Sequence, residues 1–313
     1  MMDKQTRNRI IATTTLVGLL LTTRLVSDRV GSNLNKRIID YGYGIESMDD
    51  SVNLVAHRGY SSMYPDNSLE GINACNELQC IEGIEVDVRL TKDDQLVLMH
   101  NDYIGFSKVS NFTYEELQTM DLKSSLTTRP LAFKGYNFTE QEVLAKRYDL
   151  LEDSGYTLCT LEDILKTRNK DKILFVDIKF SGYHDELLLT KIGELLKGEE
   201  NVIIQSFNGD MLALMMELYP DYTYQLLINS NMELNNIDYV FDAYGIKFEI
   251  LREGTVEDLI EHDKQVSLWT VDSYRDFKEL VDQYGEYNDS IYYISDNVDM
   301  LSYQHTKTLK KIN

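Results

Sequence analysis

The sequence predicts an α/β protein built on a closed (β/α)8 barrel of the TIM type. Short apolar runs typical of buried strands alternate with helical segments roughly eight times over about 250 residues, which is the pattern of a parallel α/β fold. A chain of 313 residues is long enough to bury one large core. Polar residues with reactive side chains follow several expected strands, and such barrels carry their sites at the carboxyl ends of the strands. These observations favour a closed barrel over an open sheet.

The first part of the expected barrel combines short strands with helices that begin at polar capping residues. Asn67 is expected to cap the first helix, and Glu70 three residues later resembles the second half of a capping box. Thr113 and Thr160 stand in the same position before two later helices. Strands are expected at 52–56, 84–90 and 96–99, and helices at 69–79, 113–120 and 160–167. Residues 123–155 are irregular and mixed in charge, so they are interpreted as an insertion or a long loop.

The second part alternates regularly between strands and helices. Strands are expected at 172–178, 201–205, 222–228, 266–271 and 290–294, with one or two more in 237–241 and 244–248. Helices are expected at 186–196, 211–218, 255–262, 274–284 and 298–303. We therefore expect one barrel domain over 51–305, preceded by a polar connector at 28–50.

The N-terminal segment, residues 1–27, has the pattern of a signal peptide or an uncleaved membrane anchor. Lys4, Arg7 and Arg9 precede an uncharged, largely apolar run at 10–23. The basic flank predicts that the N-terminus stays in the cytoplasm. We therefore expect a protein at the cell membrane with an extracytoplasmic catalytic domain, or a secreted protein.

The charge of the chain limits its possible partners. The formal net charge is −21, and a body this acidic argues against binding to a nucleic-acid backbone, which needs clustered cations. An anionic substrate would need a local cation, either a metal ion or a few Arg and Lys side chains. The three cysteines, Cys75, Cys80 and Cys159, do not have the spacing of metal ligands and are expected to be free, buried thiols.

One stretch, 54–102, concentrates residues with reactive side chains. His57 and His100 each follow a short apolar run, and Glu85 and Asp87 lie between them. Alternate residues of a strand share a face, so the two carboxylates point the same way. Buried carboxylates this close repel one another, and a hard divalent cation such as Mg²⁺ or Ca²⁺ would resolve this. Taken alone, however, such a pair is more often two ordinary acids on an exposed strand face.

The surrounding residues strengthen the interpretation as an active site. Two imidazoles whose pKa values lie near neutrality can act as general acid and general base. Arg58 can hold a phosphate with two hydrogen bonds. Asp177 and Lys179, on a later expected strand, would add a third oxygen ligand and another cation. Together these residues would let an acidic protein bind an anionic phosphodiester.

The motifs of this chain resemble those of the glycerophosphodiester phosphodiesterase family, whose fold is a (β/α)8 barrel. The family's opening motif, His-Arg-Gly followed by Pro-Glu-Asn-Thr, is matched by residues 57–59 and 65–68, and its Glu-x-Asp pair by Glu85 and Asp87. The later matches are Asp177-Ile178-Lys179, Gln205-Ser206-Phe207, Trp269-Thr270-Val271-Asp272 and Ser295-Asp296-Asn297. The resemblance extends over about residues 52–303.

The resemblance implies a role for each matching residue. The acid–base pair would be His57 and His100, and the metal ligands would be Glu85, Asp87 and Asp177. Substrate contacts would come from Arg58, Asn67, Lys179 and Trp269, although a core aromatic explains the tryptophan almost equally well. Two departures stand out: Asp177 replaces the usual Glu, and Asn101 separates His100 from Asp102.

The expected function is therefore metal-dependent hydrolysis of glycerophosphodiesters to an alcohol and glycerol 3-phosphate, with small or lipid-derived diesters as substrates. Three alternatives remain open on the same fold. The first is a phospholipase D-like enzyme, the second a hydrolase of glycerol-phosphate wall polymers, and the third a non-catalytic barrel that acts as a binding module.

Overall fold

The protein is described by a computed structural model over residues 52–122, 156–182 and 184–312. Eight parallel strands are neighbours in the order β1-β11-β10-β9-β8-β7-β6-β2, and β1 pairs again with β2 to close the barrel. The barrel strands are β1 Asn53–Ala56, β2 Gly83–Leu90, β6 Ile173–Ile178, β7 Val202–Ser206, β8 Thr223–Ile228, β9 Ala243–Lys247, β10 Gln265–Trp269 and β11 Ile291–Ser295. The predicted closed (β/α)8 barrel is confirmed.

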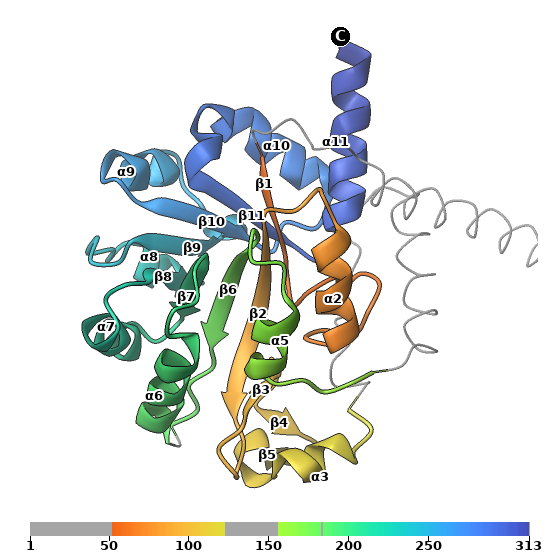
Figure 1. Cartoon of the computed structure of the whole chain (residues 1–313). Helices are drawn as coiled ribbons and strands as arrows, with labels where there is room; N and C mark the ends of the chain where they lie inside the picture. Colours follow the sequence, from red (N-terminus) through yellow and green to blue (C-terminus); the bar gives the residue numbers. More distant parts are fainter. Residues whose placement is uncertain (1–51, 123–155, 183, 313) are drawn as a thin grey trace, which may run out of the picture.

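The helices lie around the outside of the barrel (Figure 1). They are α2 Leu69–Glu77, α5 Leu161–Thr167, α6 Asp185–Leu196, α7 Gly209–Leu218, α8 Asn231–Leu234, α9 Thr255–Glu261, α10 Tyr274–Tyr284 and α11 Val298–Ile312. Within the described ranges, short 3-10 helices lie at Val109–Asn111, Phe248–Ile250 and Gly285–Ser290. Apolar side chains of the helices pack on the outward faces of the strands and form the main core.

A small added unit follows β2 and extends its carboxyl end. Strand β3, Leu96–Leu98, runs antiparallel to the last residues of β2. A hairpin of β4, Tyr103–Ile104, and β5, Ser107–Lys108, comes next, and α3, Tyr114–Gln118, completes the unit. The hairpin and α3 lie together beside the end of β2 (Figure 1). This arrangement brings the segment after β3, with His100, to the mouth of the barrel.

The barrel interior has its own apolar layer. The side chains of Val55, Phe175, Ile203, Tyr292 and Ile294 form a cluster separate from the core beneath the helices. Glu85 of β2 pairs in register with Phe175 of β6, so the first carboxylate lies at the level of this apolar layer. The polar residues of the interior therefore begin where the apolar layer ends.

The structure corrects two local expectations. Of the one or two strands expected within 237–248, one forms, β9, and residues 237–241 are not a strand. Ser68, rather than Asn67, caps α2, because its hydroxyl accepts a hydrogen bond from the N–H of Gly71. Glu70 does not close a capping box; its carboxylate instead accepts hydrogen bonds from Thr157. Thr113 and Thr160 form the expected helix caps.

Three expectations fall on residues outside the described ranges. These are the N-terminal segment 1–27, the connector 28–50 and the insertion 123–155. The described part of the chain contains no helix that is both long and apolar enough to cross a membrane. The three cysteines are buried and unpaired, as expected.

Gly193 is the most closely packed glycine among the described helices, so its substitution should lower stability. A Cβ atom at Gly193 of α6 would lie 2.2 Å from the ring of Tyr219, so Gly193→Ala requires the ring to move. We expect a loss of about 1–3 kcal/mol in the free energy of unfolding, despite the better helix propensity of alanine.

Gly209→Ala in α7 is the matched control, because its Cβ would meet only Leu226, at an ordinary 3.5 Å. Denaturant unfolding of both variants measures the difference. Equal stabilities for the two variants would contradict the predicted close packing at Gly193.

Candidate active site

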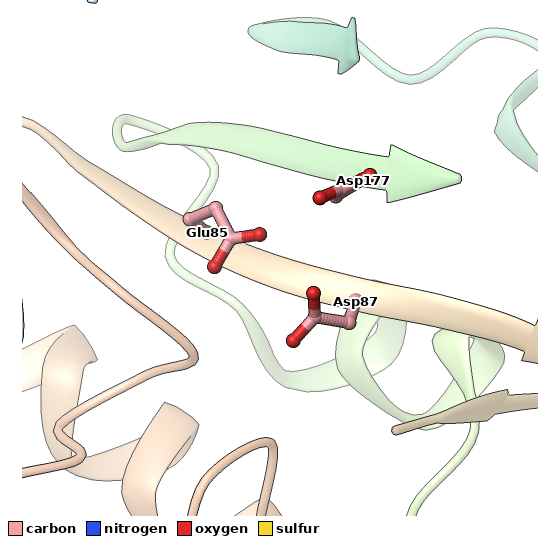
Figure 2. Close-up of side chains that lie close together, drawn as sticks. All are labelled: Glu85, Asp87 and Asp177. Atoms are coloured by element: carbon pink, nitrogen blue, oxygen red, sulfur yellow. The ribbon is translucent and has the colours of Figure 1, made fainter. Parts of the chain in front are cut away.

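Three buried carboxylates form the centre of the site. Glu85 and Asp87 alternate on β2, and Asp177 lies beside Asp87 in register on β6. One oxygen from each carboxylate lies within 4.8 Å of the others, and the residues are 2%, 1% and 3% exposed. Figure 2 shows the three side chains close together on these two neighbouring strands. The structure therefore brings together the three residues expected to bind a metal ion.

The electrostatics of the cluster reflect the cost of burying negative charge. Burial, together with the charge of Asp87, raises the pKa of Glu85 to about 8. Burial also raises the pKa of Asp177. The pKa of Asp87 is shifted the other way: burial would raise it, but Lys179 and Arg58 outweigh that effect and hold it well below its usual range. The cluster thus carries negative charge that its protein neighbours balance only in part.

The donor set of this cluster fits a divalent cation. Within the described ranges, Oδ1 of Asp177 is buried and has no hydrogen-bond partner. A buried carboxylate oxygen without a partner is costly, and a cation would satisfy it. Three carboxylates with all-oxygen ligation suit a hard ion such as Mg²⁺ or Ca²⁺.

Two cations border the carboxylates. Arg58 Nε lies 3.2 Å from Asp87 Oδ2, and Nη1 donates to Asp66 at 2.8 Å. Lys179 Nζ lies 2.9 Å from Asp87 Oδ1 and 2.5 Å from Asp177 Oδ2. Lys179 follows Asp177 by two residues and therefore reaches the same side of β6. The cations expected to contact phosphate are thus already held at the cluster.

Asn67 holds Asp87 in two ways. The NH₂ group of its side chain donates to Asp87 Oδ2 at 2.7 Å, and its side-chain oxygen Oδ1 accepts a hydrogen bond from the backbone N–H of Asp87 at 3.0 Å. Asn67 adopts a positive φ of 56°, a conformation that asparagine tolerates better than most residues. These two hydrogen bonds therefore tie the loop after β1 to β2. Because they use the side chain of Asn67, this side chain does not cap α2.

His57 follows β1 and is held by a carboxylate that directly follows the last strand, β11. Its Nδ1 lies 2.7 Å from Asp296 Oδ1, and its Nε2 lies 3.8 Å from Glu85 Oε2. Burial and the charge of Arg58 lower the pKa of His57, but Asp296 and Glu85 outweigh them and raise it to about 9. Asp272 accepts a hydrogen bond from the backbone N–H of Asp296 at 2.8 Å and steadies this partner.

His100 has different surroundings. Its Nδ1 lies 3.2 Å from the side-chain oxygen of Asn101, the residue that separates it from Asp102. Burial lowers the pKa of His100 to about 4, and although Asp87 opposes this shift, the charge of Arg58 adds to it. The carbonyl of His100 accepts hydrogen bonds from Arg89 at 2.6 and 3.0 Å, so β2 also positions this loop.

Trp269 ends β10 and packs edge-on against Phe207, with the ring centroids 5.6 Å apart. Its indole Nε1 is buried and has no hydrogen-bond partner within the part of the chain that the structure describes. A pocket of about 460 Å³ opens beside Lys179 and is also lined by Phe180, Phe207 and Asn208. Trp269 therefore supports one wall of the mouth through Phe207.

The sequence matches a family model described as the glycerophosphoryl diester phosphodiesterase family over residues 57–286. The chain belongs to this family. A glycerophosphodiester phosphodiesterase from Caldanaerobacter subterraneus subsp. tengcongensis is 27% identical over 245 residues, covering 73% of this chain and 89% of that protein. The predicted enzyme class, a phosphoric diester hydrolase, is confirmed by this membership.

Solved structures show the same fold. A phosphodiesterase from Oleispira antarctica, in complex with the product sn-glycerol-3-phosphate, matches with a TM-score of 0.61 and 17% identity, over 82% of this chain and 96% of that chain. The glycerophosphodiester phosphodiesterase from Thermotoga maritima matches with a TM-score of 0.59 and 20% identity, over 82% of this chain and 100% of that chain. At these identities the likeness supports the barrel itself.

Sequence reasoning assigned no role to three residues that hold the predicted phosphodiesterase site together. Asp296 binds His57, Arg89 binds the carbonyl of His100, and Gln205 donates to Glu85 at 3.4 Å. Asp296 and Gln205 fall inside motifs that resemble the family, but a motif alone does not say which side chain each one contacts. The roles of the predicted site residues themselves stay predictions.

Asn67 offers a test of how the site is held. Asn67→Ala removes two hydrogen bonds to Asp87 and places a Cβ-bearing residue without a polar side chain at a positive φ. We expect a loss of about 1.5–3 kcal/mol in the free energy of unfolding for the hydrogen bonds, one of which ends on a charged group.

Asn67→Gly separates the two contributions, because glycine adopts this backbone conformation without strain. It should be more stable than the alanine variant by about 1 kcal/mol, while remaining less stable than the wild type. A wild-type free energy of unfolding for Asn67→Gly would show that the contacts to Asp87 contribute little.

Proposed function

We propose that this protein hydrolyses glycerophosphodiesters to an alcohol and glycerol 3-phosphate at the mouth of its barrel. One observation carries the proposal: a buried three-carboxylate cluster lies against His57 and two cations, within 4 Å. Family membership and the named relatives support this substrate class. The presence of both histidines and all three carboxylates disfavours a non-catalytic binding module.

We propose Glu85, Asp87 and Asp177 as the ligands of one divalent cation, either Mg²⁺ or Ca²⁺. When bound, such an ion would stabilise negative charge on the phosphate oxygens. Asp177 is one methylene shorter than the usual glutamate, but one of its carboxylate oxygens lies within 4.8 Å of those of Glu85 and Asp87, so the shorter side chain still provides a donor oxygen.

The two histidines are proposed to divide the proton transfers. Asp296 and Glu85 favour the protonated form of His57, whereas burial and the charge of Arg58 favour the neutral form of His100. His57 is therefore the better proton donor to the leaving alkoxide, and His100 the better acceptor of a proton from the attacking water. Asp296 keeps the His57 ring oriented so that Nε2 faces the cluster.

Arg58 and Lys179 are proposed to bind the phosphate while they balance the carboxylates. Both cations contact Asp87, so they reduce the repulsion that a diester anion would meet near the cluster. The pocket beside Lys179, with Phe180 and Phe207 in its wall, provides space for one of the two alcohol groups. Trp269 is proposed to help shape this alcohol-binding pocket by packing against Phe207.

The location of the protein is a further proposal. We propose that the basic and then apolar pattern of residues 1–27 carries the barrel to the outer side of the membrane, as an anchored or a secreted protein. The mass of the protein in the membrane and medium fractions of the producing cells distinguishes the two forms. Recovery of the intact chain in the cytosolic fraction alone would contradict both.

The acid–base assignment is tested by single alanine variants of the full chain. His57→Ala and His100→Ala should each lower kcat for glycerophosphocholine and glycerophosphoethanolamine by about 100- to 10,000-fold, because each removes one proton transfer. His262→Ala is the matched control, since this histidine is exposed and stacks on Tyr239 beyond the C-terminal end of α9. Wild-type rates in either site variant would rule out the assignment.

The metal assignment is tested by removing the ion. After EDTA treatment the full chain should lose activity and unfold at a lower temperature, and added Mg²⁺ or Ca²⁺ should restore both. Asp177→Asn should weaken binding of the restoring ion, measured by calorimetry, since it removes one charged ligand. Activity that is insensitive to EDTA would contradict a metal-dependent reaction.

A further inference from the structure

A continuous row of hydrogen bonds crosses the barrel interior and ends on Glu85. Ser267 of β10 donates to Gln225 of β8 at 2.7 Å, and Gln225 donates to Gln205 of β7 at 2.7 Å. Gln205 in turn donates to Glu85 Oε1 at 3.4 Å, the longest and therefore the weakest of the three bonds. All four residues are at most 2% exposed, so these side chains have few other partners to choose from.

The row has a direction that the carboxylate imposes. A carboxylate that binds a cation is ionised and only accepts hydrogen bonds, so Gln205 must turn its NH₂ group towards Glu85 when Glu85 acts as a metal ligand. Its carbonyl oxygen then faces Gln225, which must present its own NH₂ group, and the remaining oxygen of Gln225 accepts from the Ser267 hydroxyl. Each member is satisfied only in this orientation, and a buried polar row is stable when every member is satisfied.

The strand between Gln225 and Ser267 leaves space for the row. Gly245 of β9 pairs in register with Ser267 on one side and with Leu227 on the other. A Cβ atom at Gly245 would lie 3.0 Å from Nε2 of Gln225 and 2.5 Å from Leu227. Glycine at this position therefore lets the Gln225 side chain reach across the interior.

Glu85 needs such support more than its two neighbours. Asp87 is held by Asn67, Arg58 and Lys179, and Asp177 by Lys179. Glu85 has a longer side chain than the two aspartates. In the described part of the chain, its Oε2 accepts one hydrogen bond, from the backbone N–H of Arg58 at 3.0 Å. The row from Ser267 supplies the contact to the other oxygen.

We infer that Gln205 and Gln225 are positioning residues that set the carboxylate of Glu85 for the divalent cation. They do not touch the ion; they orient one of its ligands through the row. The inference rests on the proposed metal site. It assigns a role to Gln205, which lies in the Gln205-Ser206-Phe207 motif, and to Gln225, which lies in no motif considered above.

The test is the affinity of the full chain for Mg²⁺ or Ca²⁺ alone, measured by calorimetry after removal of bound metal. Gln205→Met and Gln225→Met keep the length of the side chain but remove its hydrogen bonds. Each should weaken binding by about 10- to 100-fold, the usual effect of losing a group that orients a metal ligand. Ser267→Ala, at the far end of the row, should weaken binding less than either.

Tyr224→Phe is the matched control. Tyr224 precedes Gln225 on β8, faces the helical layer, is fully buried and donates to backbone carbonyls at 2.7 and 3.2 Å. The variant should lose stability, measured by denaturant unfolding in EDTA, and keep the wild-type metal affinity. A purely structural role for the glutamines predicts the same result for Gln225→Met as for Tyr224→Phe, and that result would overturn the inference.

The outcomes separate the inference from the proposed function. Absence of metal binding by the wild-type chain would contradict the proposed metal site itself. Binding that is equal in the wild type and in both methionine variants would contradict only the positioning role. If Gln205→Met does not fold, the metal affinities of Gln225→Met and of the milder Ser267→Ala still test the inference. Unchanged affinity in both variants would overturn it.

Discussion

The site depends on how the barrel balances buried negative charge. Glu85, Asp87 and Asp177 lie within 4.8 Å of one another, and Asp66 adds a fourth carboxylate beside Arg58. Two permanent cations in the described chain, Arg58 and Lys179, contact this group directly. His57 also lies 3.8 Å from Glu85, but Asp296 pairs with it and balances its charge. With all four carboxylates ionised, these two cations leave two negative charges, which one divalent cation would balance. Burial and this excess charge together raise the pKa of Glu85, whereas at Asp87 the two cations outweigh the effect of burial and lower the pKa.

The main features of the fold and the composition of the site could be predicted from the sequence because they depend on local patterns. The alternation of apolar runs and helices identified the barrel, and the i, i+2 spacing placed Glu85 and Asp87 on one face of a strand. These steps need no knowledge of loop conformation. The structure adds the register of β2 with β6, which pairs Asp87 with Asp177.

The contacts that hold the site could not be predicted in this way. Asn67 and Ser68 are both good capping residues, so the local rule could not decide between them; the choice depends on the positive φ of Asn67 and its reach to Asp87. Asp296 meets His57 across 239 positions of sequence. A pattern of residue types likewise makes the two histidines equivalent, and only their neighbours in space separate them.

The depth of each ligand in the barrel explains what supports it. Asp87 and Asp177 pair with each other near the ends of their strands, where Arg58 and Lys179 reach them from the mouth. Glu85 pairs with Phe175, one interior level deeper, at the edge of the apolar layer. A charged side chain from a loop could reach both carboxylate oxygens of Glu85 at this depth only if it were buried itself. Neutral amides carry a smaller burial cost than ions, and a row of them crossing the interior brings a hydrogen-bond donor to the deepest ligand without adding charge.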